Sequence, residues 1–359
     1  MKAAIFESPN NINIIERQVW EPPKGFQLLK VLSCSVCSYD VRVYRTGSFK
    51  VKPPIILGHE ISAETTSAYK GKNIELKPNT RVCIYPIIPC LQCWYCENSL
   101  YNLCSNLTEI GSTINGGFAE YILIPNKMFE IEGVVPIPDS ISNEEASLIE
   151  PLACCINGIN QVKLQNINKN ITIIGDGPIG IMQLKLLLLK FPDSKIEVIG
   201  KIPKRLEIAI NAGATKATLF DEKEKETEEE KNMIKHSEKK ESPNLVFVSN
   251  NNPKSLDFAL NLINRNGQLM IFSGIKNIGD PQSKKMITID PNVIHYNQIT
   301  ITGSFSSVPE NLTTAIDLVS TGKIDLKDLI THRFSLDNLL SAIKSTEEFN
   351  GLKSVINKF

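Results

Sequence analysis

A glycine-rich turn between an apolar strand and an apolar helix restricts the fold of this chain more than any other feature. We expect the strand at 170–174 and the helix at 179–190, and the turn begins Gly175-Asp176-Gly177-Pro178-Ile179-Gly180. A GxGxxG pattern alone is weak, but in this context its first glycine permits a tight turn, its second lets the backbone approach a pyrophosphate, and its third allows close helix–strand packing. The helix N-terminus then faces the anion. This turn predicts a dinucleotide site, and a nucleotide-free turn of the same shape is the alternative.

Strands and helices continue to alternate after this turn. Apolar β-runs follow at 195–199, 244–248 and 267–272, and a helical pattern lies at 204–212. Such alternation is typical of a parallel sheet wound by right-handed crossovers. We therefore predict an α/β fold whose doubly wound, Rossmann-type domain covers residues 158–296.

The remainder of the chain has a different texture. Residues 1–157 indicate short strands and turns, with prolines and glycines such as Pro53-Pro54 between them. From about residue 300 strand and helix mix again, with helical apolar spacing at 315–318 and 339–343. Because 359 residues exceed one ordinary core, we expect 1–157 and 297–359 to form a second domain, with the active cleft between the two domains.

Four of the nine cysteines crowd into one short segment, at Cys90, Cys93, Cys96 and Cys104. Thiolates at this spacing can surround a tetrahedral zinc with Zn–S distances of about 2.3 Å. Four thiolates fill the coordination shell, so this zinc is expected to be structural. Four unrelated buried cysteines are the alternative. We interpret Cys34, Cys83, Cys154 and Cys155 as core residues, because free cysteine is a small buried hydrophobe.

The charge balance excludes several classes of partner. Lys+Arg and Asp+Glu both number 39, so no global basic field attracts a nucleic acid or an anionic membrane. The longest apolar run, 171–191, is interrupted by Asp176, Pro178 and Lys185, and Glu7 comes too early for a signal peptide. We expect a cytoplasmic protein whose partner is a small molecule. The Glu/Lys-rich stretch 221–241, which includes His236, indicates an exposed helix or a mobile insertion.

A second, dispersed set of polar residues has the donor atoms of an open zinc site. A zinc that carries out chemistry keeps a position free for substrate. The candidates are Cys37, His59, Glu60 and Glu150. Each is weak alone, since His59 could be structural and Glu150 could cap a helix.

The order of these features resembles the medium-chain alcohol dehydrogenase family over essentially the whole chain. The motifs follow one another in the same order as in that family: Cys37, Gly58-His59-Glu60, the four-cysteine lobe at about 86–108, Glu150-Pro151 and the glycine turn. The strand that follows the lobe in that family is similar to Gly116-Gly117-Phe118-Ala119-Glu120-Tyr121. The segment 47–60 is particularly similar to sorbitol dehydrogenases, within the sorbitol (polyol) and threonine dehydrogenase subgroup.

This resemblance implies a GroES-like, mostly β catalytic domain and a catalytic zinc held by Cys37, His59, and Glu60 or Glu150, which exchange. It also implies zinc-dependent hydride transfer between an alcohol and NAD(P), and a homotetramer or homodimer. A polyol with a secondary hydroxyl is the expected substrate. A threonine dehydrogenase-like or sugar-phosphate dehydrogenase is one rival, and a non-catalytic nucleotide-binding zinc protein is another.

Two positions depart from the family pattern. Family members usually carry Ser or Thr two residues after the ligand cysteine, where it begins the proton relay, and this chain has Tyr39 there. Five residues after Cys37, where the subgroup often has His, this chain has Arg42. Tyr39 keeps a hydroxyl, so we retain it as a catalytic candidate, whereas Arg42 cannot lose a proton near neutrality. Water could instead carry the proton.

The residues after the second β-run bear on the choice of cofactor. NAD enzymes place an acid about 20 residues after the glycine turn to hold the ribose hydroxyls. That place is Gly200, and Lys201, Lys204 and Arg205 follow it. The missing acid and the three cations predict a preference for NADP, although basic residues at a helix start are often only solvated and NAD stays possible.

Overall fold

The structure is a computed structural model that describes residues 1–72, 74–163, 170–220, 242–275 and 289–359. The charged stretch 221–241, with His236, lies outside these residues. The chain divides into two compact units, one of Met1–Cys154 and Ser306–Phe359 and one of Cys155–Phe305. Among the described residues, no helix combines the length and the apolar character needed to cross a membrane.

The second unit is built on a parallel sheet of six strands in the order β15-β14-β13-β16-β17-β18. Strand β13 at its centre, Asn170–Ile174, is apolar and buried along most of its length, as expected of a strand covered on both faces. The other strands are β14 (Lys195–Gly200), β15 (Lys216–Leu219), β16 (Leu245–Val248), β17 (Gln268–Ile271) and β18 (Thr300–Gly303).

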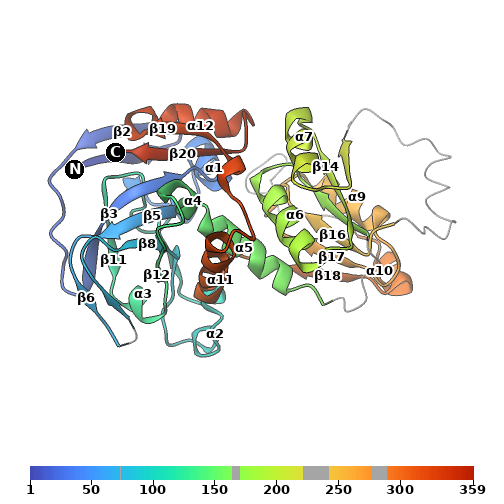
Figure 1. The fold of residues 1–359 in the computed structure, drawn as a ribbon, viewed down its shortest axis with the longest axis horizontal. Coiled ribbons are helices and arrows are strands. Elements are labelled where there is room, and N and C mark those ends of the chain that lie inside the picture. The colour runs from blue at the N-terminus through green and yellow to red at the C-terminus, as the bar shows by residue number, and fades with distance from the viewer. Residues whose placement is uncertain (73, 164–169, 221–241, 276–288) are drawn as a thin grey trace. The chain divides into compact units, whose positions relative to one another are not determined.

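Helices connect these strands by crossovers (Figure 1). From β13 the chain first moves toward β15 and later toward β18, so right-handed connections put the two sets of helices on opposite faces. The helices are α6 (Pro178–Lys190), α7 (Pro203–Asn211), α9 (Lys254–Leu262) and α10 (Pro291–Asn297). Both α6 and α7 begin with proline, whose fixed φ suits the first helical position. The predicted doubly wound α/β sheet is confirmed.

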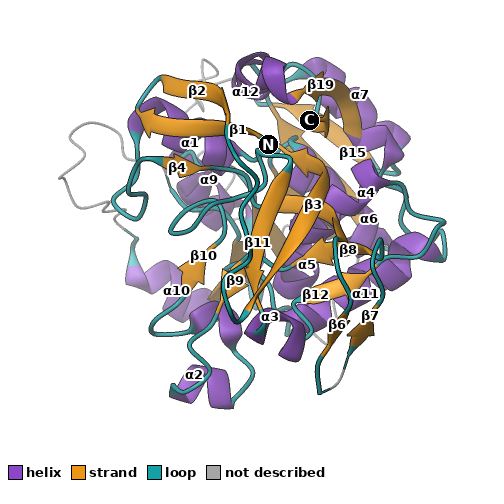
Figure 2. Ribbon diagram, turned by 90° about the vertical axis from the view of Figure 1, so that its left-hand side faces the viewer, coloured by secondary structure: helices purple, strands orange, loops and turns teal. Residues whose placement is uncertain are grey.

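The first unit is mostly β (Figure 2). Its main sheet of seven strands has the order β12-β8-β5-β3-β20-β19, with β11 also paired to β3. These strands are β12 (Val134–Pro136), β8 (Arg81–Ile84), β5 (Glu60–Thr65), β3 (Phe26–Ser35), β20 (Lys353–Lys358), β19 (Ile330–Ser335) and β11 (Tyr121–Pro125). The chain end thus pairs with the strand that leads to Cys37.

Smaller sheets and short helices complete this unit. The small strands are β1 (Lys2–Ser8), β2 (Asn11–Glu16), β4 (Ile55–Ile56), β6 (Tyr69–Lys70), β7 (Glu75–Leu76), β9 (Ile87–Ile88) and β10 (Thr108–Glu109). The α-helices are α1 (Ser38–Thr46), α2 (Trp94–Glu97), α3 (Lys127–Glu130), α4 (Asn143–Ser147), α11 (Pro309–Ser320) and α12 (Leu339–Glu347), and α5 (Ile149–Asn160) crosses into the second unit. Single 3₁₀ turns are η1 (Tyr101–Leu103), η2 (Lys327–Leu329) and η3 (Leu336–Asn338).

One boundary differs from the sequence prediction. The chain returns to the first unit at Ser306, whereas we expected the return at residue 297. The reason is β18, which pairs with β17 and forms the edge of the parallel sheet. Its mixture of half-buried and exposed residues gives no apolar run that marks it as a sheet strand in the sequence.

Candidate metal centres and cofactor turn

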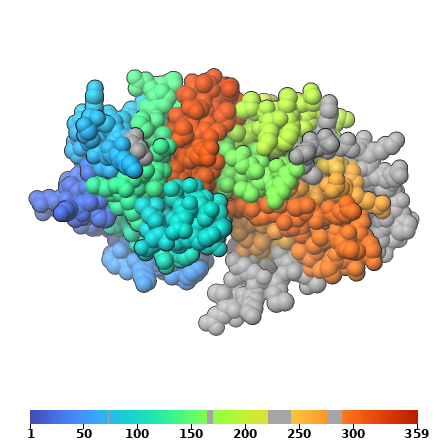
Figure 3. All heavy atoms as spheres, turned by 90° about the horizontal axis from the view of Figure 1, so that it is seen from below, coloured from blue at the N-terminus to red at the C-terminus, as the bar shows by residue number. Residues whose placement is uncertain are grey.

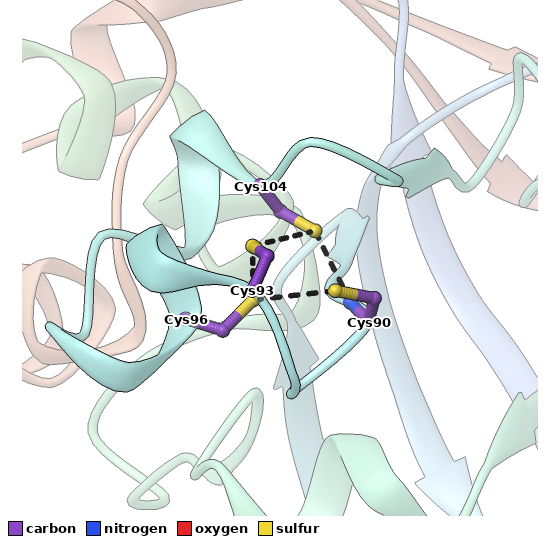
Figure 4. A group of neighbouring side chains, drawn as sticks. All are labelled: Cys90, Cys93, Cys96 and Cys104. Carbon is purple, nitrogen blue, oxygen red and sulfur yellow. Dashed lines mark hydrogen bonds between the residues drawn. The ribbon is translucent and has the colours of Figure 1, made fainter.

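The four-cysteine lobe brings its thiols together (Figure 4). The Sγ atoms of Cys90, Cys93, Cys96 and Cys104 all lie within 4.8 Å of one another. The Cys93 and Cys96 sulfurs are 3.5 Å apart, and 3.9 Å separates the Cys93 sulfur from that of Cys104. A backbone N–H of Ser105 lowers the pKa of Cys93 to about 6, which favours the thiolate that binds metal. This closed set of four soft donors fits zinc and leaves no open position.

Local structure explains how so short a segment gathers four sulfurs. Cys93 lies just before the one-turn helix α2 and Cys96 within it, and Leu91 adopts a positive φ that turns the chain between the first two cysteines. Cys104 ends the following 3₁₀ turn and accepts the backbone N–H of Cys90. The lobe lies at the surface, where Trp94 is 64% exposed (Figure 3).

A second group of donor atoms forms at the first unit's main sheet. Ligand atoms of Cys37, His59 and Glu60 also lie within 4.8 Å of one another. Cys37 lies between β3 and α1, whereas His59 precedes β5 and Glu60 begins it. Because β3 and β5 are antiparallel neighbours with Ser35 opposite Glu60, the sheet register brings the end of one strand beside the start of the other. Sulfur, imidazole and carboxylate together are a donor set that zinc accepts.

Asp40 holds two segments of this group together, although the sequence analysis did not identify it. It is fully buried, and its carboxylate accepts the backbone N–H of Cys37 at 2.9 Å and that of Gly58 at 3.2 Å. Its Oδ1 lies 3.6 Å from Nδ1 of His59. Burial lowers the pKa of His59, but Asp40 and Cys37 raise it well above its usual value. A carboxylate behind a histidine fixes the ring and directs its other nitrogen toward a metal.

Lys353 is a further residue that the sequence did not reveal. Its Nζ lies 2.6 and 2.5 Å from the two carboxylate oxygens of Glu60, and both side chains are buried. Ser35 Oγ donates to the same carboxylate. Burial lowers the pKa of Lys353, and the Glu60 charge outweighs it and raises that pKa. Only the pairing of β20 with β3 brings this lysine, 293 residues away, to Glu60.

Glu150 lies on α5 and is not in the compact group of donor atoms among the described residues. It is 6% exposed, and burial raises the pKa of its carboxyl group, while the charge of His59 lowers it. Its Oε1 accepts the Cys154 thiol at 3.3 Å. Of the four candidate ligands, the structure thus gathers three and places the fourth close enough for its charge to act on them.

Tyr39 faces the same region. Its ring lies edge-on to that of His59, with centroids 5.8 Å apart, and its hydroxyl is 2.8 Å from Oγ of the buried Ser112. The guanidinium of Arg42 lies 5.2 Å from the centre of the Tyr39 ring. Ser112 was not predicted from the sequence, since nothing local to it indicates a partner for Tyr39.

In the second unit, the glycine turn has the close packing that its pattern predicts. A Cβ at Gly180 would lie 1.9 Å from the Gly175 carbonyl oxygen, so a side chain there would push the turn off the helix. Gly175 has a φ of 140° and donates its N–H to Ile199. Gly177 precedes the first residue of α6 and makes no side-chain cap, and the N-terminus of a helix is a position that favours phosphate.

The surroundings of Gly200 differ from the expectation. We expected open space and no acid at Gly200, but the Asp176 carboxylate lies against this glycine. Lys201 and Lys204 are exposed, whereas Arg205 is buried. The premise of the NADP prediction, a strand end without an acid, therefore does not hold.

Comparisons with known proteins show the family to which the chain is similar. The alcohol dehydrogenase GroES-like domain family matches residues 24–139, and the zinc-binding dehydrogenase family matches 178–321. Sorbitol dehydrogenase of Bacillus subtilis (strain 168) is 31% identical over 97% of this chain and 94% of its own. A zinc-binding dehydrogenase of Sinorhizobium meliloti 1021 bound to NADP is 26% identical, with a TM-score of 0.84 over 99% of this chain and 98% of that one. An alcohol dehydrogenase of Escherichia coli CFT073 complexed with NADH is also 26% identical, with a TM-score of 0.83 over 99% of each chain.

Proposed function

The chain belongs to the zinc-containing medium-chain alcohol dehydrogenase family, and from that premise we propose that it oxidises a secondary hydroxyl of a polyol or sugar alcohol. It is a zinc-dependent oxidoreductase that uses NAD(P). The observation that carries the proposal is the convergence of Cys37, His59 and Glu60 where the neighbouring central strands β3 and β5 end and begin, in this family's fold. Its donor set fits a zinc ion with a position left for substrate.

The residues around this group have separate tasks in the proposed reaction. When bound there, zinc supplies Lewis-acid stabilisation of the substrate alkoxide, which eases departure of the hydride. Asp40 fixes the His59 ring, and Lys353 offsets the Glu60 charge. Glu60, or Glu150 in exchange with it, would provide the carboxylate ligand of that zinc. Tyr39, next to His59, would relay the alcohol proton, taking it up while passing its own hydroxyl proton to Ser112 Oγ, its hydrogen-bond partner at 2.8 Å.

We assign one zinc ion to each ligand group, hence two per chain. The four-cysteine lobe is closed, so its ion is structural, whereas the group at Cys37 has fewer protein ligands and is catalytic. The glycine turn with Gly175, Gly177, Pro178, Ile179 and Gly180 binds the pyrophosphate. Assembly into a homo-oligomer and a cytoplasmic location remain predictions.

The polyol assignment rests on the polarity of the site. A carboxylate in place of a second thiolate makes the zinc environment harder and more polar. Each hydroxyl of a buried polyol needs a hydrogen-bond partner, which an apolar alcohol pocket would not provide. The likeness of segment 47–60 to sorbitol dehydrogenases and the Bacillus subtilis relative support the same class.

Arg42 favours the principal rival, a substrate with a carboxylate or phosphate such as threonine or a sugar phosphate. Its guanidinium lies over Tyr39, which itself contacts the His59 ring. A purely nucleotide-binding protein without turnover is set aside, because the chain belongs to a family of dehydrogenases and keeps Cys37, His59 and Glu150.

Steady-state kinetics separate these substrates. We expect neutral polyols to have the highest kcat/KM in a panel of polyols, threonine and phosphorylated sugars tested with both cofactors. Arg42→Ala should leave the polyol values within about twofold, since the guanidinium then recognises no part of the substrate. If threonine or a phosphorylated sugar exceeds every polyol and Arg42→Ala removes that advantage, the polyol assignment is wrong.

A further inference from the structure

The structure supplies an acid at the ribose end of the cofactor turn from an unexpected place. In dinucleotide-binding sheets this acid usually stands at the end of the second strand, where it accepts hydrogen bonds from the ribose hydroxyls. Strand β14 ends at Gly200, which has no side chain. The neighbouring strand β13 pairs with it in parallel, with Ile174 opposite Ile199. Asp176, two residues beyond Ile174, therefore comes to the same edge of the sheet.

The Asp176 side chain lies against Gly200. A Cβ built on Gly200 would be 2.3 Å from the Asp176 Cβ and 2.4 Å from its Cγ and Oδ2. Oδ2 accepts the backbone N–H groups of Lys201 at 2.8 Å and Ile202 at 2.7 Å. These two bonds hold the carboxylate at the start of the loop into α7. The fixed position of this carboxylate also explains why residue 200 is glycine, because any side chain there would collide with Asp176.

The second oxygen of this carboxylate remains available. None of the residues that the structure describes donates a hydrogen bond to Oδ1 of Asp176, although the residue as a whole is only 9% exposed. A carboxylate fixed through one oxygen is well prepared to accept a ribose hydroxyl with the other, because little conformational entropy is left to lose.

The basic residues near Asp176 do not create a binding site for a cofactor 2′-phosphate. Arg205 is 5% exposed, and its Nη1 lies 3.9 Å from where a Cβ of Gly177 would be, next to the turn that carries Asp176. Burial lowers the pKa of Arg205 and the Asp176 charge raises it, so the two groups already interact. The Nζ of Lys201 lies 5.8 Å from the centre of the Phe220 ring. A 2′-phosphate would therefore lie near the negative Asp176 carboxylate and near Arg205, whose charge already interacts with Asp176.

We propose that Asp176 performs the role of the missing strand-end acid, binding the adenosine ribose hydroxyls and repelling a 2′-phosphate, so that the chain prefers NAD(H) to NADP(H). The inference rests on the proposed function and refines its cofactor. It reverses the preference expected from Gly200 and the basic residues after it, because the sequence shows which residue ends a strand but not which side chain reaches that end from the next strand.

Equilibrium binding tests this directly, with NADH and NADPH titrated separately into the zinc-loaded protein and followed by the fluorescence of the reduced nicotinamide. The wild-type protein should bind NADH about tenfold or more tightly than NADPH, since a hydrogen bond to a charged group contributes about 1.5–3 kcal/mol. Asp176→Asn should weaken NADH and strengthen NADPH, because the amide keeps an oxygen for the backbone N–H groups but loses the charge. Asp257→Asn, on the exposed side of α9, removes the same charge elsewhere in the unit and should change neither affinity.

The outcomes are distinct. Tighter binding of NADPH by the wild type, or an equal loss for both cofactors in Asp176→Asn with an unchanged melting temperature, would overturn the role of Asp176 and leave the dehydrogenase assignment intact. Binding of neither nucleotide by folded, zinc-loaded protein would overturn the proposed function and this inference with it.

Discussion

At the scale of single residues, the ion pair between Lys353 and Glu60 places a compensated charge beside the group formed by Cys37, His59 and Glu60. The pair is almost completely buried, with side chains 6% and 2% exposed. A buried ion pair adds little net stability, but removing one partner leaves an uncompensated charge in the interior. Lys353 therefore compensates the charge of Glu60, one of the three grouped donor residues, within the interior.

We predict that Lys353→Met lowers the free energy of unfolding by about 3–5 kcal/mol, because Glu60 is left buried without its partner. Urea denaturation followed by tryptophan fluorescence and circular dichroism measures the change. Lys344→Met is the matched control, since Lys344 is 67% exposed in a surface pair with Glu348 and should cost less than about 1 kcal/mol. Equal losses in the two variants would show that the buried pair has no special role.

The same residues show what the sequence could and could not predict about the site. The donors of the lobe lie within 15 positions, from Cys90 to Cys104, so their spacing alone predicts a common site. Lys353 and Ser35 reach Glu60 only through strand pairing, which no local pattern reveals. The GxGxxG pattern gives no role to Asp176, whose place beside Gly200 depends on the register of β13 and β14.

At the scale of elements, the sequence predicts the junction of β13, the glycine turn and α6 better than any other part of the second unit. The helix was predicted at 179–190 and extends from Pro178 to Lys190, because its nearly continuous apolar sequence fits only a buried helix. The edge strand β18 was harder to recognise, because only part of its surface is covered. Elements buried on all sides were therefore the more predictable ones.

Gly180→Ala should destabilise this junction and weaken nucleotide binding, because its methyl group would lie 1.9 Å from the Gly175 carbonyl oxygen. We expect a loss of about 1–3 kcal/mol, as for other overpacked sites, and at least a tenfold rise in the Kd for the preferred cofactor. Calorimetry and a nucleotide titration measure the two effects. Gly303→Ala on β18 meets no atom within 4 Å and should behave as the wild type. An unperturbed Gly180→Ala variant would mean that the turn does not pack as described.

At the scale of the whole molecule, the sequence predicted the architecture better than its boundaries. A mostly β unit and a parallel α/β unit follow from the change of texture along the chain, and both are present. The neutral charge balance and the two ligand groups indicated an enzyme for a small molecule, in agreement with the family. The late return to the first unit was missed, because that boundary depends on sheet pairing and not on composition.

We infer that the zinc ion of the four-cysteine lobe is structural and that the zinc ion at Cys37 is catalytic. Zinc content and turnover, determined together for the wild type, His59→Ala and Cys96→Ser, test this assignment most directly. We expect two zinc ions per wild-type chain. His59→Ala should lose one ion and all measurable turnover while its melting temperature stays close to that of the wild type. Cys96→Ser should lose the other ion and melt at a lower temperature, yet its folded fraction should still oxidise the substrate. Turnover that persists in His59→Ala, or a Cys96→Ser variant with unchanged thermal stability, would contradict the account.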